Sequence, residues 1–298
     1  MKRQHSAIEW LAALRPWSFT ASALTVITIL VYLEWSVGGV DWVNGLWALA
    51  SMILYHAAGN AWSDWFDYRS GVDTAETYGV DTLTSGRFSA ASIRNLSLAL
   101  YTTASVLGLG LAFHAGASLL YIGGCGLLLA LLYPPLKYKG MGDVVILANY
   151  CILPALGCSY VGIGKFDLSV LWVALPLGAL VNAILHANNT RDMETDMKAG
   201  AHSLAQALGP FGSAILFYAE TLLPFMGIAA LSALGKLPLC SLIILLILPM
   251  AWKNCSLMRQ YTSCQKASSI ATLDQKAALL QLIFSTLLTL SILTTIWL

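Results

Sequence analysis

Apolar residues along the chain gather in nine long stretches that are separated by short polar segments. Each stretch approaches the roughly 20 residues that a helix needs to cross the hydrocarbon core of a bilayer. Backbone groups inside a bilayer must be hydrogen-bonded within their own segment, so stretches of this length predict α-helices. We therefore expect an all-α, polytopic membrane bundle of about nine transmembrane helices. The stretches cover residues 18–34, 43–63, 94–114, 117–134, 141–163, 168–188, 211–234, 237–257 and 277–298.

These helices are expected to form a single membrane-embedded domain over residues 1–298, with a short amphipathic surface helix at about residues 5–14. Of the 298 residues, 58% are hydrophobic and 10% are charged, against about 45–50% and about 25% in a soluble domain. The composition therefore excludes an ordinary soluble protein and makes the lipid bilayer a partner. The net charge of +1 gives nucleic-acid binding no electrostatic basis. Six scattered cysteines without CxxC spacing predict packing residues rather than a zinc site or a disulfide framework.

The basic residues indicate which side of the membrane the loops occupy. If the N-terminus is cytoplasmic, nine spans place 14 of the 16 basic residues on the cytoplasmic side and only Lys165 and Lys236 on the other. This asymmetry is what the positive-inside rule predicts, because basic loops resist translocation. We therefore expect a multi-pass protein whose N-terminus faces the cytoplasm.

The acidic residues are concentrated in two of these cytoplasmic loops. Eight of the fifteen carboxylates lie there: Asp64, Asp67, Asp73, Glu76 and Asp81 in the first loop, and Asp192, Glu194 and Asp196 in the second. The loops on the outer side have few functional groups. Function is therefore expected to face the cytoplasm.

The two acidic loops begin with matching segments. On a helix, Asn60, Asp64 and Asp67 are spaced i, i+4 and i+7, and thus share one face. Asn188, Asp192 and Asp196 follow at two successive i+4 steps and share a face in the same way. Solvated helix ends are the simpler interpretation of one such segment. Two segments that both leave an apolar span and both end in glycine indicate an internal pseudo-repeat with a shared site.

Carboxylates on one face repel one another, by roughly 1 kcal/mol per pair at 4 Å in water and by more near a membrane. A cation is therefore expected to offset the repulsion. The acidic faces carry no Cys or His at soft-ligand spacing, and oxygen ligands suit Mg²⁺ or Mn²⁺. Because Mg²⁺ binds one or two carboxylates together with phosphate oxygens, two such faces across a cavity predict a diphosphate held between metal ions.

A diphosphate also needs cationic partners, and the cytoplasmic loops supply several. The candidates are Arg15, Arg69, Arg87, Lys137, Arg191 and Lys198. For each of them, a role in loop orientation alone is an equally good interpretation. For Lys137 and Tyr138 we favour contact with the diphosphate. Their loop combines Pro134-Pro135 with Gly140 and Gly142, which predicts a tight return beside the bilayer.

His56 and His186 each lie one helical turn before an acidic face. A catalytic base is one interpretation, but we favour hydrogen-bonded structural histidines. The ten tryptophans fall mostly near the ends of the predicted spans, which is typical of an interfacial aromatic belt.

At these residues the sequence resembles the UbiA superfamily of intramembrane prenyltransferases. The resemblance covers most of the chain. Its first motif is Asn60-x3-Asp64-x2-Asp67-x3-Gly71-x-Asp73, and its second is Asn188-Asn189-x-Arg191-Asp192-x3-Asp196-x3-Gly200. The second motif, the following Ser203-Leu204-Ala205, Leu14-Arg15-Pro16 and Leu136-Lys137-Tyr138 are most similar to the 1,4-dihydroxy-2-naphthoate polyprenyltransferases of menaquinone synthesis. Ser63 stands where this branch usually has Asn, and the stretch before Leu83 lacks a basic residue often found there.

The resemblance implies a helical bundle whose cavity opens toward the cytoplasm and laterally to lipid. It implies that Mg²⁺, with Mn²⁺ as an alternative, is bound by Asn60, Asp64, Asp67, Asn188, Asp192 and Asp196. It implies diphosphate contacts from Asn60, Asn188, Asn189, Arg15, Lys137, Tyr138, Arg191 and Arg87. The four motif aspartates are implied to be catalytic together with Asp73, which we assign to deprotonation of the acceptor from its distance beyond the metal-binding face.

The implied reaction joins a polyprenyl diphosphate to an aromatic acceptor in the bacterial plasma membrane. The metal ions neutralise the departing diphosphate, and an electron-rich aromatic carbon attacks the allylic cation. In the naphthoate branch, dihydroxynaphthoate is attacked at its carboxyl-bearing carbon and carbon dioxide is lost. Keeping the prenyl tail in hydrocarbon contributes about 0.8 kcal/mol per CH₂. Extraction of the tail into water would therefore be costly, which explains why the reaction takes place in the membrane.

Two alternatives remain at this point, and a third is excluded by its missing motif. One is a prenyltransferase for another aromatic or lipid acceptor. A secondary transporter also has inverted repeats, but its polar residues usually lie at mid-span rather than at the cytoplasmic ends. A CDP-alcohol phosphotransferase would need an Asp-Gly-x2-Ala-Arg segment, which the chain lacks.

Overall fold

The computed structural model describes residues 5–74 and 82–297, and these fold almost entirely into helices. Lys2, Arg3, Glu76 and Asp81 lie outside the described residues. The α-helices are α1 (Ala7–Ala13), α2 (Thr20–Ser36), α3 (Trp42–Arg69), α4 (Ala90–Ala115), α5 (Leu119–Lys137), α6 (Gly142–Leu147), α7 (Leu153–Ile163), α8 (Val170–Arg191), α9 (Met193–Lys198), α10 (Leu204–Ala233), α11 (Leu248–Cys264) and α12 (Leu273–Trp297). Short 3₁₀ segments cover Pro16–Phe19, Leu239–Ile247 and Ala267–Ile270, and a π-helical turn covers Ala148–Ile152.

The prediction of an all-α bundle with about nine membrane helices is confirmed. Among the described residues, eight helical segments are long and apolar enough to cross a membrane. Helix α3, with 28 residues, is a further long helix, and it carries the polar residues of the first motif. The predicted surface helix corresponds to α1, whose first turn is closed by a capping box between Ser6 and Glu9.

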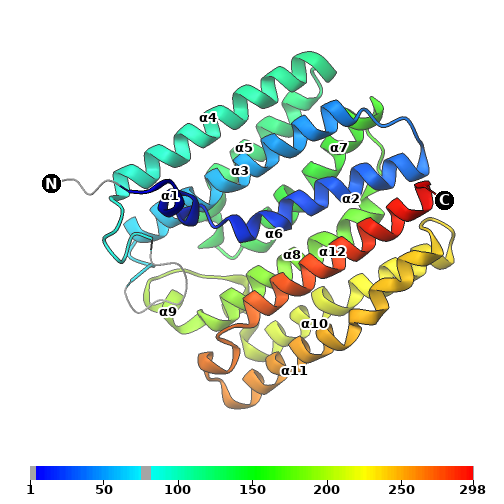
Figure 1. The fold of residues 1–298 in the computed structure, drawn as a ribbon. Coiled ribbons are helices and arrows are strands. Elements are labelled where there is room, and N and C mark those ends of the chain that lie inside the picture. Colours follow the sequence, from blue (N-terminus) through cyan, green and yellow to red (C-terminus); the bar gives the residue numbers. More distant parts are fainter. Residues whose placement is uncertain (1–4, 75–81, 298) are drawn as a thin grey trace.

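The long helices pack side by side in one bundle (Figure 1). Helix α3 packs chiefly on α4, α8 on α10, and α12 on both α2 and α8. The largest core cluster joins α2, α8, α10 and α12 through residues such as Leu33, Leu177, Phe225 and Phe284. The Phe225 and Phe284 rings meet edge to face, with their centroids 5.0 Å apart. Since lipid is as apolar as leucine, close packing of this kind is what holds helices together in a membrane.

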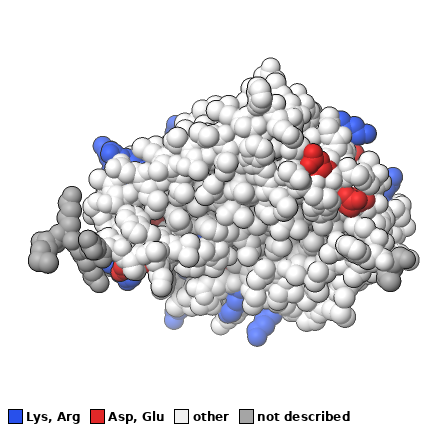
Figure 2. Space-filling view, turned by 45° about the horizontal axis from the view of Figure 1, so that its top comes forward, with Lys and Arg blue, Asp and Glu red and all other residues white. Residues whose placement is uncertain are grey.

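The outer surface of the bundle suits lipid. Large apolar side chains such as Phe113, Tyr121 and Leu246 are exposed. Figure 2 shows a face that is mostly free of charged residues, with Lys, Arg, Asp and Glu at its margins. The chain is therefore an integral, multi-pass membrane protein.

The π-helical turn between α6 and α7 has a local cause. Pro154 has no N–H to donate to the carbonyl four residues earlier, and its ring crowds that carbonyl. The backbone widens instead, and the Leu153 N–H donates to the Ala148 carbonyl five residues back. Such single π turns often mark functional positions, and this one carries Asn149 and Tyr150.

Helices α3 and α8 end at the same end of the bundle, on the left in Figure 1, beside α1 and α9. Gly71 and Gly200, both at positive φ, close the two acidic segments. The Tyr138 segment is tied to the start of α10 by a hydrogen bond from the His202 N–H to the Tyr138 carbonyl. This arrangement gathers the sequence motifs at one end of the membrane domain.

Candidate active site

One cavity of about 860 Å³ is lined by residues of both acidic segments. Asn60, Asp67 and Asp73 come from the first segment, and Asn188, Asp192 and Asp196 come from the second. The two segments lie more than a hundred residues apart in the chain, so the fold, rather than local sequence, creates their common site.

The first wall of the cavity is the C-terminal end of α3. Asn60 donates its side-chain N–H groups to the Leu14 carbonyl and to Ser18 Oγ, both at 3.0 Å. Asp67 accepts from Lys137 Nζ at 3.3 Å and from the Tyr138 hydroxyl at 2.5 Å. The tight return after α5 thus delivers a cation and a hydroxyl to a carboxylate on α3.

Asp64 lies behind this wall, buried and ion-paired with Arg15. The second oxygen of Asp64, Oδ2, is buried without a hydrogen-bond partner among the described residues. Arg15 itself has φ +56°, in the left-handed region, which costs a residue with a side chain about 1–3 kcal/mol. The Asp64 ion pair helps to hold that strained backbone, and Arg15 lines the cavity.

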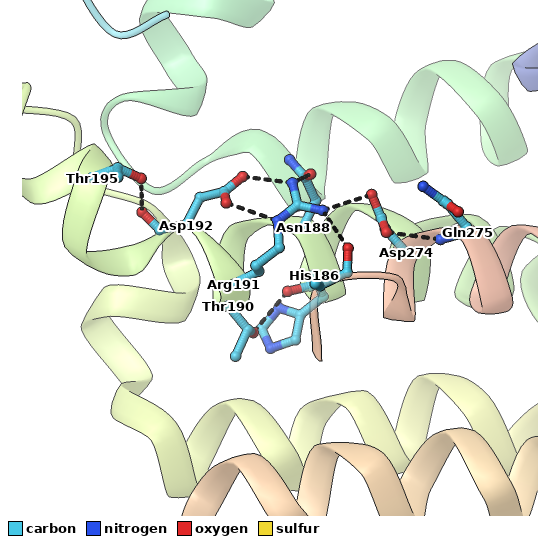
Figure 3. Close-up of polar contacts among 9 residues, drawn as sticks. His186, Asn188, Thr190, Arg191, Asp192, Thr195, Asp274 and Gln275 are labelled. Carbon is cyan, nitrogen blue, oxygen red and sulfur yellow. Dashed lines mark hydrogen bonds and ion pairs between the residues drawn. The ribbon is translucent and has the colours of Figure 1, made fainter. Parts of the chain in front are cut away.

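The opposite wall is formed around Arg191, at the end of α8 (Figure 3). Arg191 donates to both oxygens of Asp192 at 2.8 Å, to Asp274 Oδ2 at 2.9 Å, and to Asn188 Oδ1. The planar guanidinium suits such forked contacts. Asp274 begins α12 and was not anticipated from the sequence, because a single carboxylate at a span end has no distinguishing pattern.

The helix that was predicted to run through Asn188, Asp192 and Asp196 is interrupted. Helix α8 ends at Arg191, Asp192 adopts non-helical dihedral angles, and α9 begins at Met193. The Asp196 N–H still donates to the Asp192 carbonyl at 2.9 Å. The i+4 relation therefore persists across the break, and all three side chains line the cavity.

Three carboxylates at the cavity are balanced by basic partners. Arg15 is paired with Asp64, Lys137 with Asp67, and Arg191 with Asp192. Burial raises the pKa of Asp73 to about 6, and repulsion from Asp67 adds to that effect. Burial also raises the pKa of Asp196 to about 6, with repulsion from Asp192 contributing. The cavity thus holds more carboxylates than nearby cations fully neutralise.

These residues fit a divalent cation that is shared with a substrate. The donor set is carboxylate and amide oxygen, which Mg²⁺ prefers, and Asp64 Oδ2 is a buried oxygen without a partner among the described residues. Within the described part of the chain, no three His, Cys, Asp or Glu side chains are close enough to hold a metal ion by themselves. A cation would therefore need phosphate oxygens or water as further ligands.

Not every predicted site residue lines the cavity. In the described chain, Asp64, Arg87, Tyr138 and Asn189 are absent from its lining. Asp64 and Tyr138 instead contact two residues that do line it, Arg15 and Asp67. Asn189 is buried on another face of α8 from Asn188. The roles assigned to these residues remain predictions.

Both histidines are held by hydrogen bonds, as expected of structural residues. His56 pairs with Ser22 Oγ at 2.9 Å and with Ser18 Oγ at 3.3 Å. His186 is fully buried; its Nε2 bonds the Ser213 carbonyl at 3.1 Å, and its Nδ1 lies 3.5 Å from Asp143 Oδ1. The Asp143 contact joins α6 to α8 just behind the cavity.

The deeper part of the cavity was not anticipated. It is lined by aromatic and amide side chains within the spans together with apolar ones: Met52, Tyr55, Tyr133, Asn149, Tyr150, Val181, Ile184, Leu185 and Gln281. The available signal was the presence of Asn149 and Gln281 within apolar stretches, since polar residues inside a membrane helix commonly serve a function.

Comparison with known proteins agrees with the fold and with the motifs. The model of the UbiA prenyltransferase family matches residues 22–273, and the chain belongs to this family. It is therefore a prenyl-transferring enzyme.

Its relatives include "UbiA prenyltransferase domain-containing protein 1" of Homo sapiens, which is 32% identical over 298 residues, covering 92% of this chain and 80% of that protein. The protein of the same name from Gallus gallus is 30% identical, covering 85% of this chain and 76% of that one.

The fold is similar to that of solved structures. A UbiA homologue from Archaeoglobus fulgidus, described as bound to DMAPP and Mg²⁺, has a TM-score of 0.64 at 14% identity and covers 96% of this chain and 99% of its own. An apo UbiA homologue from Aeropyrum pernix K1 has a TM-score of 0.65 at 14% identity, covering 93% and 97%. At these identities the likeness concerns the fold.

Proposed function

We propose that the protein transfers a polyprenyl group from polyprenyl diphosphate to 1,4-dihydroxy-2-naphthoate, with loss of carbon dioxide, and that the reaction requires Mg²⁺. The observation that carries the proposal is the convergence of two acidic segments and three basic side chains in one cavity. The homologue described as bound to DMAPP and Mg²⁺ and another described as bound to GPP and Mg²⁺ support this choice of substrate and metal.

In this proposal the diphosphate lies between the two acidic segments. Arg15, Lys137 and Arg191 turn from their carboxylate partners toward phosphate oxygens and bind them by charge-assisted hydrogen bonds. Asp64, Asp67, Asp192 and Asp196, with the amides of Asn60 and Asn188, would hold Mg²⁺. When bound, the metal supplies charge neutralisation for the leaving diphosphate. Tyr138 orients Asp67 through its hydroxyl, and Asn189 and Arg87 are assigned supporting roles near the diphosphate.

The membrane-facing part of the cavity protects the reaction from water. As the bond between the prenyl carbon and the diphosphate oxygen breaks, the side chains of Val181, Ile184 and Leu185 face the hydrocarbon chain. An allylic cation in such a site survives until a carbon nucleophile attacks, because water is excluded. The new carbon–carbon bond forms at the carboxyl-bearing carbon of the acceptor, and the carboxylate leaves as carbon dioxide.

Asp73 is proposed to take a hydroxyl proton from the acceptor. It lines the cavity and is joined to α3 by a hydrogen bond from its N–H to the Asp67 carbonyl at 3.2 Å. Removal of that proton makes the aromatic ring more electron-rich. We also propose that the N-terminus is cytoplasmic, which the distribution of basic residues among the loops supports. The bacterial plasma membrane is proposed as the location because the motifs resemble the naphthoate branch.

The proposal is tested with purified protein in lipid nanodiscs, a radiolabelled prenyl diphosphate and Mg²⁺. Dihydroxynaphthoate, homogentisate and 4-hydroxybenzoate are offered side by side. We expect labelled product with dihydroxynaphthoate, together with release of carbon dioxide. Product with a different acceptor only would contradict the proposed acceptor, and the absence of any Mg²⁺-dependent transfer would contradict the proposed reaction.

A further inference from the structure

Three polar side chains in the deep part of the cavity are not among the residues assigned to the diphosphate: Tyr55, Asn149 and Tyr150. Tyr55 lies at the middle of α3, five residues before Asn60, which at 1.5 Å per residue places it about 7–8 Å deeper in the membrane. Asn149 and Tyr150 belong to the π-helical turn. All three line the same cavity as the acidic segments.

Two of these residues carry buried polar atoms that remain unsatisfied. The Tyr55 hydroxyl and the Asn149 Oδ1 atom have no hydrogen-bond partner among the described residues. Buried polar atoms in proteins are nearly always bonded, and exceptions call for an explanation such as a ligand.

The two substrates of a prenyl transfer differ in what they can offer these atoms. A polyprenyl chain has no hydrogen-bonding group below its diphosphate. A hydroxylated aromatic ring has donors and acceptors at its edge and a flat face for aromatic contact. Tyr150, whose ring meets the His56 ring edge to face at 4.7 Å, supplies an aromatic surface beside Asn149.

We propose that Asn149 and Tyr55, with Tyr150 beside them, bind the hydroxyl groups of the aromatic acceptor and determine its specificity. Asn149 Oδ1 accepts from one acceptor hydroxyl, and the Tyr55 hydroxyl bonds an oxygen of the same ring. The position is suitable because the acceptor must lie beside the first carbon of the prenyl chain, just below the diphosphate. This inference rests on the proposed transfer to an aromatic acceptor.

The π-helical turn gives these residues their place. A π-helical turn holds one residue more than an α-helical turn. In a regular α-helix, the same extra residue would rotate all the side chains after it by about 100° around the helix axis. The widened turn before Pro154 carries both Asn149 and Tyr150, and both line the cavity.

Tyr101 provides a matched control. Its hydroxyl is likewise buried without a hydrogen-bond partner among the described residues, and its ring packs edge to face on Tyr55 at 5.2 Å. Tyr101 does not belong to the described lining of the cavity. Its hydroxyl lies toward Gly59, 3.6 Å from the position that a Cβ atom would occupy there.

The experiment compares Asn149→Leu, Tyr55→Phe and Tyr101→Phe in nanodiscs, with separate titration of acceptor and of prenyl diphosphate. We expect Asn149→Leu and Tyr55→Phe to raise the acceptor KM by about tenfold each, the worth of one hydrogen bond. The prenyl diphosphate KM should stay within about twofold of wild type, and Tyr101→Phe should change neither constant.

A second comparison uses the acceptor and its O-methyl ether, which lacks one hydroxyl donor. Wild type should prefer the free hydroxyl, and Asn149→Leu should lose most of that preference, because the partner atom is gone. Acceptor KM values within twofold of wild type in both variants, or equal increases in the Tyr101→Phe control, would overturn the proposal. An equal rise of both substrate KM values would overturn it as well.

Failure of the proposed reaction gives a different result. If the wild type transfers no prenyl group to any acceptor, binding of 1,4-dihydroxy-2-naphthoate is measured directly by calorimetry. Binding to wild type that weakens about tenfold in Asn149→Leu would support the site although the reaction is wrong. No binding of dihydroxynaphthoate, homogentisate or 4-hydroxybenzoate to wild type would overturn the inference itself.

Discussion

Single residues in the cavity show how an acidic site can exist at a membrane surface. Each of three carboxylates has a basic partner in the protein, so the cluster does not depend on screening by water. In the proposed reaction, the same basic side chains change partner when a diphosphate binds. Replacing a side chain that contacts these carboxylates, such as Tyr138, should therefore weaken the use of prenyl diphosphate more than the binding of the acceptor.

Replacement of Tyr138 by Phe removes the hydroxyl that donates to Asp67. A hydrogen bond to a charged group is worth about 1.5–3 kcal/mol, so we expect kcat/KM for prenyl diphosphate to fall at least about tenfold. Steady-state kinetics check the effect, with Tyr121→Phe on the exposed surface of α5 as control. An unchanged kcat/KM would show that Tyr138 does not orient Asp67 during turnover.

Asp143 serves the site from behind, through His186. The His186 Nε2 atom bonds the Ser213 carbonyl, and the buried Nδ1 atom faces Asp143 Oδ1 at 3.5 Å. We expect Asp143→Leu to lower the free energy of unfolding by about 1–3 kcal/mol, since it removes the polar group that faces the buried Nδ1 atom. Asp143→Asn, whose amide can donate to Nδ1, should cost clearly less. Thermal unfolding in detergent measures both, and equal losses would contradict this assignment.

Helices and turns set the direction of these side chains. The end of α3, the break at Asp192 and the return after α5 each place one polar group toward the common cavity. The π-helical turn does the same for the deeper wall. Irregular backbone therefore occurs where side chains must be aimed, while the regular spans between provide the packed frame.

Pro154→Ala tests the origin of the π-helical turn. Alanine restores an N–H that can donate to the Tyr150 carbonyl, so the turn can close to a regular α-helix. We expect the acceptor KM to rise by about tenfold or more as Asn149 and Tyr150 rotate, while prenyl diphosphate binding and thermal stability are maintained. Unaltered acceptor kinetics would show that the turn does not depend on Pro154 or does not position the acceptor.

For the whole molecule, the sequence predicts the bundle well and the site in part. Span lengths follow from bilayer thickness, and the motif spacing places Asn60 and Asp67 on one face of a helix. Sequence separation cannot reveal that Asp274 pairs with Arg191, because this contact depends on how α8 and α12 pack. The π-helical turn and the buried position of Asp64 were equally unpredictable, since they arise from backbone strain and tertiary contacts.

The complete site should also be visible as stabilisation by ligands. A ligand at 100 times its Kd that binds only the folded protein contributes about 2.7 kcal/mol. We expect Mg²⁺ with a non-reactive prenyl thiodiphosphate to raise the melting temperature, and either component alone to do so much less. The result would be contradicted if the analogue stabilised the protein equally well in excess EDTA.

The central claim is that the two acidic segments act as one site. The most direct measurement is Mg²⁺-dependent binding of the prenyl thiodiphosphate to Asp67→Asn, Asp192→Asn and the double variant, with the outer carboxylate variant Asp167→Asn as control. We predict that each single variant binds the analogue about a hundredfold or more weaker than wild type. The double variant should bind little more weakly than either single variant, because the effects of substituting residues that act as a unit are not additive. Wild-type affinity in either single variant, or fully multiplicative losses in the double variant, would contradict the claim.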